Sequence, residues 1–170
     1  ERGKKIDHRI YKAAVFSVPC RLEDCAQKLA EPANAIYMRT FLNSLRGKVR
    51  TKKARFPDEI DDTGLEQIKD FIEFDNLYTA PAHGFDDAFH YWRTQSSANF
   101  VGDIRVPALL VQARNDPFLT ESCLPYDEAR ASEFFHLETP ECGGHVGFTR
   151  LSRDGLFWSE QRALEFVLDP

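Results

Sequence analysis

The chain has 170 residues, of which 42% are hydrophobic and 29% are charged, a balance typical of folded globular proteins rather than disordered ones. Its formal net charge of −5 excludes an overall positive field that would gather nucleic acid or anionic lipid, so we expect a small molecule or another protein as its partner and no nucleic acid. The four cysteines include no C-x-x-C pair, which indicates neither a zinc ribbon nor a disulfide scaffold.

The chain also lacks the features of a membrane protein. No apolar run approaches the roughly 20 residues that a transmembrane segment needs, and the charged start ERGKK is unlike a signal peptide. One segment, RGKVRTKKAR at residues 46–55, is basic, and the acidic run DEIDD follows it. We interpret it as a solvated helix end whose charges are offset nearby, with a phosphate or headgroup contact as the alternative. We therefore expect a cytoplasmic protein with reduced thiols.

The first predicted elements are a strand and a helix. Residues 11–18, YKAAVFSV, form an apolar run that Pro19 ends, which is typical of a parallel strand buried on both faces. The helix after it has apolar residues at positions i, i+3, i+4 and i+7, namely Leu22, Cys25, Ala26 and Leu29. A strand followed by a helix indicates an α/β fold.

Residues 32–81 break this alternation, because they contain no convincing strand. They predict a long amphipathic helix whose apolar face carries Met38, Phe41, Leu42, Leu45 and Val49, and a shorter helical piece around residues 64–73. We interpret the segment as a helical insertion. Its apolar stripe either packs on the parent domain or contacts a ligand.

The α/β alternation resumes after residue 84. A helical stripe of Phe85, Ala88, Phe89 and Trp92 precedes the strongest strand signal of the chain, IRVPALLVQA at residues 104–113. A helical or irregular stretch at 119–132 leads to a weaker strand at 134–138 and a glycine-rich loop, ECGGHVGF. A closing helix is predicted from Trp158 to Leu168.

Two candidate catalytic residues follow neighbouring predicted strands. Asp116 lies just past the strand at 104–113, and His145 lies in the glycine-rich loop past the strand at 134–138. The carboxyl ends of parallel strands meet at one edge of a sheet, where ligands gather. An aspartate that accepts the Nδ1 proton of a histidine leaves Nε2 free to deprotonate a nucleophile. Gly143, Gly144 and Gly147 would allow the tight backbone path that such a histidine needs beside a substrate.

Plainer interpretations of these residues stay open. Asp116 in the run NDP is also typical of an aspartate that hydrogen-bonds within its own turn, and His145 of a surface histidine. Cys142 and His145 form a C-x-x-H pair, but a metal site needs further ligands and no second pair is suitably spaced. His8, His83, His90 and His136 lack such a strand-end acid and are interpreted as structural.

No nucleophile completes a triad within the chain. The sequence contains no G-x-S-x-G motif, which would place a serine on a sharp turn between a strand and a helix. Ser17 ends the first predicted strand without such glycines and is interpreted as a polar residue that closes it. Cys20 and Cys25 are no better placed.

Several long motifs, in order, carry a resemblance to a known family. The segments AVFSVPCRLEDC, FDNLYTAPAHGFDDAFHYW, IRVPALLVQARNDPF and CGGHVGF resemble the C-terminal half of the α/β-hydrolases typified by bacterial YheT and plant EMB8 proteins. The resemblance runs from about residue 10 to the end and implies that Asp116 is the triad acid and His145 the triad histidine. Asn115 replaces an acidic residue usual at its position. The resemblance also implies a serine elbow upstream of this chain, with ERGKKIDHR as the end of the following helix and its loop.

The resemblance thus implies the C-terminal part of an α/β-hydrolase fold, with about three parallel strands, flanking helices and a helical lid. The core would comprise residues 1–31 and 82–170, with the acid and histidine loops in the latter, and residues 32–81 would form the cap. The full protein would hydrolyse acyl or lipid-like carboxylic esters without a cofactor or metal, and this chain alone would be inactive. Met38, Phe41 and Tyr37 would be apolar lid residues.

Two other functions stay open, and so does the chain's state of association. The chain could be a non-catalytic interaction or structural module that keeps the hydrolase fold. Acyl transfer to an acceptor other than water would use the same residues as hydrolysis. The strand at 11–18 would lack a neighbour on one side, so we expect self-association through this edge or instability of the isolated chain.

Overall fold

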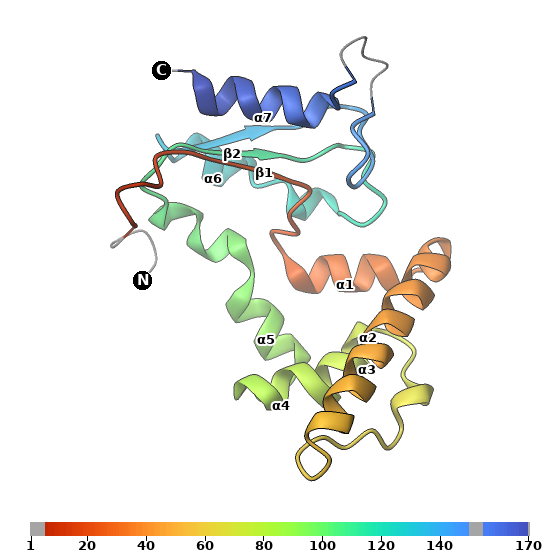
Figure 1. Ribbon diagram of the computed structural model, residues 1–170. Coiled ribbons are helices and arrows are strands. Elements are labelled where there is room, and N and C mark those ends of the chain that lie inside the picture. The colour runs from red at the N-terminus through yellow and green to blue at the C-terminus, as the bar shows by residue number, and fades with distance from the viewer. Residues whose placement is uncertain (1–5, 150–154, 170) are drawn as a thin grey trace. The chain divides into compact units, whose positions relative to one another are not determined.

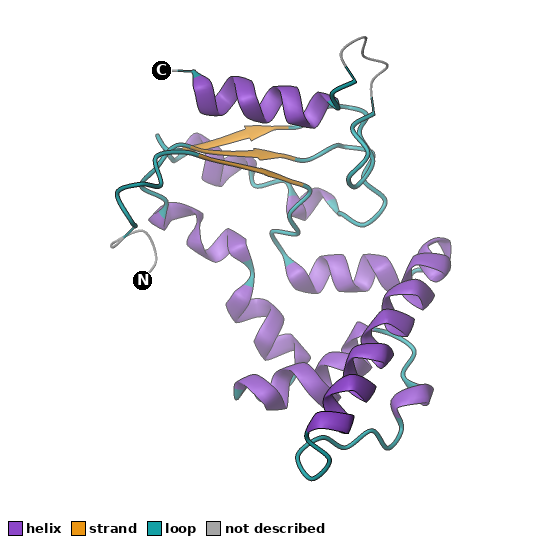
Figure 2. Cartoon of the chain, in the orientation of Figure 1, coloured by secondary structure: helices purple, strands orange, loops and turns teal. Residues whose placement is uncertain are grey.

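A computed structural model of the protein describes residues 6–149 and 155–169 (Figures 1 and 2). The strands are β1 (Ala13–Phe16), β2 (Ala108–Val111) and β3 (Phe135–Glu138). The α-helices are α1 (Leu22–Ala30), α2 (Ala35–Arg55), α3 (Phe71–Phe74), α4 (Ala80–His83), α5 (Ala88–Gln95), α6 (Tyr126–Arg130) and α7 (Trp158–Leu168). Short 3-10 turns are η1 (Pro32–Asn34), η2 (Leu65–Gln67), η4 (Ser97–Asp103) and η5 (Glu121–Cys123), and η3 (Asp75–Thr79) is π-helical. The charged start of the chain, residues 1–5, lies outside the described residues.

The three strands form one parallel sheet in the order β1-β2-β3, which confirms the predicted parallel pairing of consecutive strands. Ala13 pairs with Ala108, and Ala108 with Phe135. The strands are shorter than the predicted 11–18 and 104–113. At β2 the reason is Pro107, which has no backbone N–H to donate to a ladder, so regular pairing begins only after it.

Alternate residues of β2 face opposite sides of the sheet, and each side has its own apolar cluster. Leu109 and Val111 pack with Trp158 and Phe166 of α7. The opposite face carries Leu110, which packs in a cluster with Ala129 of α6 and Val101 of η4. Figure 1 shows α7 and α6 on opposite faces of the sheet. These two layers position the loops that follow β2 and β3.

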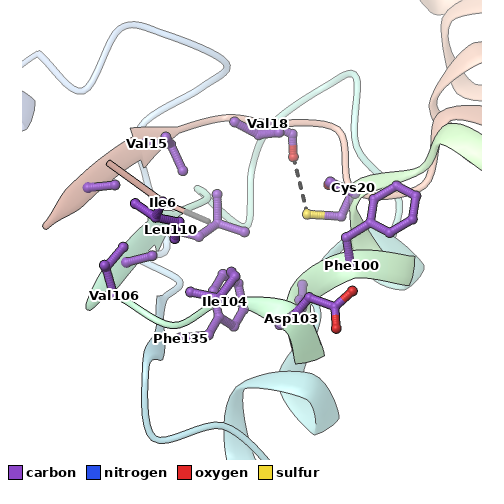
Figure 3. A pocket seen from close by; sticks show the side chains of 14 residues that line it. Ile6, Val15, Val18, Cys20, Phe100, Asp103, Ile104, Val106, Leu110 and Phe135 are labelled. Atoms are coloured by element: carbon purple, nitrogen blue, oxygen red, sulfur yellow. Dashed lines mark hydrogen bonds between the residues drawn. The ribbon is translucent and has the colours of Figure 1, made fainter. Parts of the chain in front are cut away.

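The prediction that the first strand is buried on both faces is wrong. Val15 in β1 is 41% exposed, because β1 pairs only with β2 among the described residues and little of the described chain covers Val15. An apolar cavity of about 440 Å³ opens over the face of the sheet that carries Val15, Leu110 and Phe135, and Val18 also lines it (Figure 3). Within the described residues, this face of the sheet is therefore left partly uncovered at β1.

The chain divides into two compact units, Glu1–Cys25 with Gln95–Pro170, and Ala26–Thr94. The described residues of the second unit form helices, turns and loops and no strand, as expected from the lack of a convincing strand in residues 32–81. Met38, Leu42 and Val49 of α2 are buried, whereas Phe41 remains 36% exposed. The apolar stripe of α2 is therefore only partly covered.

The basic segment at 46–55 is the C-terminal part of α2, where positive charge is favourable against the helix dipole. Arg46 and Arg50 contact Glu66, and Arg46 also donates to the backbone oxygen of Ile68 at 2.7 Å. These two arginines therefore find their acidic partner at Glu66 rather than in the adjacent run DEIDD. Among the described residues, no helix is both long and apolar enough to cross a membrane.

Candidate active site

Asp116 lies in the turn that follows β2, and its side chain is fully buried. Oδ1 accepts a hydrogen bond from the backbone N–H of Phe118 at 2.9 Å, which is the local turn contact expected of an aspartate at this position. Oδ2 instead faces His145. The two carboxylate oxygens therefore make both contacts considered from the sequence, and the interpretations of Asp116 as a turn residue and as a partner of His145 are compatible.

His145 lies in the loop after β3, and its Nδ1 is 2.8 Å from Asp116 Oδ2. An ionised carboxylate can only accept, so Nδ1 carries the hydrogen and donates it. The imidazole is about one-third exposed and packs against the Phe118 ring, with 4.7 Å between ring centroids. Within the described residues, Nε2 makes no hydrogen bond. The ring is thus oriented by a buried acid and a phenyl group, and its second nitrogen remains available.

Two of the glycines around His145 are required for different physical reasons. Gly144 adopts a left-handed φ of 61°, which residues other than glycine rarely adopt. At Gly143, an added Cβ would lie 2.5 Å from the Phe148 ring and 2.8 Å from Ala113 Cβ. Phe148 is buried between Phe16 and Trp158, so its ring anchors the end of the loop in the core. At Gly143, packing against Phe148 and Ala113 therefore excludes any side chain.

Asn115 connects the acid loop to the histidine loop. Its Oδ1 accepts hydrogen bonds from the backbone N–H groups of Gly143 at 3.0 Å and Gly144 at 2.9 Å. The sequence marked Asn115 only as a departure from an acidic residue, because nothing in the local pattern reveals a contact to a loop 28 positions away. Phe118 and Phe148 were likewise not predicted as supports of the site.

Chemically, the arrangement matches two members of a nucleophilic triad. A buried carboxylate that accepts from Nδ1 fixes the tautomer in which Nε2 can accept a proton, and it stabilises the imidazolium that results. No group of three or more histidine, cysteine, aspartate or glutamate side chains suited to a metal ion occurs among residues 6–149 and 155–169. The described geometry is thus that of an acid–base pair.

The other sequence candidates lie apart from this pair. Cys142 is exposed, whereas Cys20 and Cys25 are buried. Ser17 ends β1 with a positive φ of 55°, and its buried hydroxyl has no hydrogen-bond partner among the described residues. A second histidine–carboxylate contact, His90 to Asp86, is a solvent-exposed i, i+4 pair in the helical unit.

Comparison with known proteins gives the chain its family. It is 33% identical over 138 residues to "Putative esterase YheT" of Escherichia coli (strain K12), covering 80% of this chain and 40% of that protein. It is 26% identical to an abhydrolase domain-containing protein of Dictyostelium discoideum, covering 89% of this chain and 39% of the relative. The chain belongs to the YheT-like group of α/β-hydrolases. Its parallel sheet with flanking helices fits part of that fold.

The YheT-like chain spans about two-fifths of the length of these two relatives. A shorter match, 35% identical over 101 residues, is to "Medium-chain fatty acid ethyl ester synthase/esterase 2" of Saccharomyces cerevisiae (strain ATCC 204508 / S288c), and covers 59% of this chain and 22% of that protein. No protein-family model matches the YheT-like chain, and no solved structure does. The family assignment therefore rests on sequence relatives that are named as esterases or hydrolase-domain proteins.

Proposed function

We propose that this chain is the acid-and-histidine part of a serine hydrolase that cleaves carboxylic esters, and that the nucleophilic serine lies upstream of it in the full protein. The observation that carries the proposal is the 2.8 Å contact between His145 Nδ1 and the fully buried carboxylate of Asp116. A carboxylate without access to water has few partners, and here its partner is a partly exposed imidazole. The relatives named as esterases support the same chemistry.

In the proposed mechanism, His145 Nε2 takes the hydroxyl proton of the serine as its oxygen attacks the ester carbonyl. The tetrahedral intermediate collapses, the alcohol leaves with the proton from His145, and an acyl-enzyme forms. Water then attacks the acyl-enzyme, with His145 again the base, and releases the carboxylic acid. Asp116 keeps the ring in the correct tautomer and stabilises its positive charge during both steps. The proposed reaction uses neither a cofactor nor a metal.

We propose that residues 32–81 are the lid of this hydrolase and that residues 1–31 and 82–170 belong to its core. Of the three apolar lid residues, Met38 is buried, whereas Tyr37 and Phe41 on α2 are 47% and 36% exposed. Only the latter two are therefore available to an acyl chain. Relatives named "Phospholipase ABHD3" and "Monoacylglycerol lipase" favour acyl or lipid-like esters as the substrate class. We also propose that the protein is located in the cytoplasm.

Two other functions have specific observations in their favour. The synthase/esterase name of the yeast relative favours acyl transfer to an alcohol, which would use the same acyl-enzyme and histidine. The absence of a G-x-S-x-G motif from these 170 residues favours a non-catalytic module. We also propose that the isolated chain associates with a second copy through the edge of β1 that pairs with no strand among the described residues, because an unpaired strand edge beside an apolar surface is a template for pairing.

The test of the catalytic proposal is ester hydrolysis by the natural gene product that contains this chain. His145→Ala should lower kcat for a p-nitrophenyl acyl ester by about 10³-fold or more, because the serine loses its base. The matched control is His83→Ala, which removes an exposed histidine of α4 and should leave kcat unchanged. Full activity in the His145→Ala protein would refute the assignment, and an inactive wild-type protein would favour the module.

A further inference from the structure

Two cysteines that the proposed hydrolysis does not use lie in contact inside the sheet-containing unit. Cys25 is on α1 and Cys123 is in η5, 98 positions later, and their sulfur atoms are 3.2 Å apart. Both residues are buried, and they share an apolar cluster with Leu119. Their distance in the chain explains why no cysteine motif announces the pair.

The contact is held by neighbours on both elements. Arg21 Nε donates to the backbone oxygen of Ser122 at 3.0 Å, and the Ser122 hydroxyl donates to the carboxylate of Asp24 on α1. These bonds flank Cys25 and Cys123 and fix α1 beside η5. A disulfide has an S–S length of about 2.05 Å, so the sulfurs need to approach by only about 1 Å. Side-chain rotation can supply that movement while the two elements stay in place.

The two thiols are also chemically unequal. The hydrogen bond from the Cys25 thiol lowers the pKa of Cys123, and the Thr120 hydroxyl, 3.5 Å away, acts in the same direction. The same contact, together with burial, raises the pKa of Cys25. Cys123 is therefore the thiol that loses its proton first, and thiolates are the reactive form of cysteine.

We propose that Cys25 and Cys123 form a reversible disulfide when the protein meets a peroxide. The Cys123 thiolate attacks one oxygen of hydrogen peroxide, the O–O bond breaks, and a sulfenic acid forms with release of hydroxide. Cys25 sulfur then attacks the Cys123 sulfur, the S–O bond breaks, and water leaves with the Cys25 proton. The pair loses two electrons to the peroxide, and a dithiol reductant reverses the change by thiol–disulfide exchange.

The cross-link would join α1 to the segment that carries the candidate acid, since Cys123 follows Asp116 by seven positions. It would also close a long loop and so restrict the unfolded chain. We expect the oxidised protein to melt at a higher temperature than the reduced protein.

The test is peroxide treatment of the natural gene product that contains this chain, followed by alkylation, thiol counting and tryptic mass mapping. The number of free thiols, counted in denaturant, should fall by two, and peptides 22–28 and 115–130 should appear joined until dithiothreitol is added. Cys142→Ser, which removes the exposed thiol, should leave the cross-link intact. Cys25→Ser should abolish it.

Two results would overturn the proposal. One is an unchanged number of free thiols in the wild-type protein at peroxide levels that oxidise a small-molecule thiol completely. The other is conversion of Cys123 to a sulfinic acid with no joined peptides. Because the readout is a covalent bond rather than ester hydrolysis, either result leaves the proposed catalytic function untouched, and failure of that function leaves the disulfide untouched.

Discussion

Asn115 joins the two loops of the candidate site through a single side-chain oxygen that accepts from two backbone N–H groups. It touches neither Asp116 nor His145 through these bonds, so it acts on the site by fixing the backbone of the histidine loop. An aspartate could make the same two contacts, because a carboxylate is also an acceptor.

We predict that Asn115→Ala lowers kcat of the natural gene product about tenfold, because two hydrogen bonds are together worth about 1–3 kcal/mol. KM should change little, since the loop positions the base rather than the substrate. Asn115→Asp should keep most of the activity, because a carboxylate oxygen can accept from the same two backbone N–H groups. Amide hydrogen exchange at Gly143 and Gly144 should accelerate in the alanine variant only. Unchanged exchange in that variant would contradict the positioning role.

At the residue scale, the sequence predicted that Asp116 and His145 would meet, but not the residues that hold them in place. Asp116 and His145 follow from strand order, because parallel neighbours bring their carboxyl ends together. Asn115, Phe148 and the contact between Cys25 and Cys123 depend on side-chain packing between segments far apart in the chain. No periodicity within either segment carries that information.

Among the elements, the helical unit contains a partly buried acid that is not part of the candidate site. Asp75 begins η3 and accepts hydrogen bonds from Thr79 Oγ1 at 2.6 Å and from Trp92 Nε1 of α5 at 2.7 Å. Burial raises the pKa of Asp75 above its ordinary value of 3.8, and the two hydrogen bonds only partly oppose this effect. The folded state therefore favours the protonated acid.

This shift predicts a pH dependence of stability. The contribution from Asp75 is fully present below the ordinary pKa of 3.8 and is lost as the pH rises through the higher folded value. Asp75→Asn should therefore raise the free energy of unfolding at pH 7 relative to wild type, with a smaller difference at pH 4. Urea unfolding at both pH values measures this difference, with the exposed Asp58→Asn as control. An equal effect of Asp75→Asn at both pH values would contradict the prediction.

Element types were largely predictable, and element lengths were not. The periodic stripes of residues 22–29 and 38–49 correspond to α1 and α2, and the closing helix matches α7. The strands shortened because Pro107 limits β2 and because β1 lacks a second partner among the described residues. A run of apolar residues marks a strand but does not indicate how much of it finds a partner.

At the scale of the whole molecule, the described residues leave apolar surface of the sheet uncovered at β1. Val15 is exposed on β1, the adjacent cavity is apolar, and the buried Ser17 hydroxyl and Gln112 Oε1 have no hydrogen-bond partner among the described residues. A buried polar atom without a partner costs about 1–3 kcal/mol, so these two atoms lower the stability of this part of the sheet.

We predict that the isolated 170-residue chain forms dimers or larger species in a concentration-dependent manner. Val15→Lys should reduce this association, because a charged side chain on an edge strand opposes pairing. Light scattering coupled to size-exclusion chromatography measures the mass, and Leu168→Lys, at an exposed position on α7, is the matched control. A monomeric wild-type chain with a cooperative melt would contradict the prediction.

The most direct test of the central claim is the reaction of the natural gene product with a fluorophosphonate, which labels only an activated serine. If Asp116 and His145 serve a serine nucleophile, intact mass should show one label per chain in the wild-type protein and in His83→Ala. Labelling of His145→Ala should be slower by about 10³-fold or more. A wild-type protein that takes up no label, or a His145→Ala protein labelled at the wild-type rate, would contradict the assignment of this pair to a serine hydrolase.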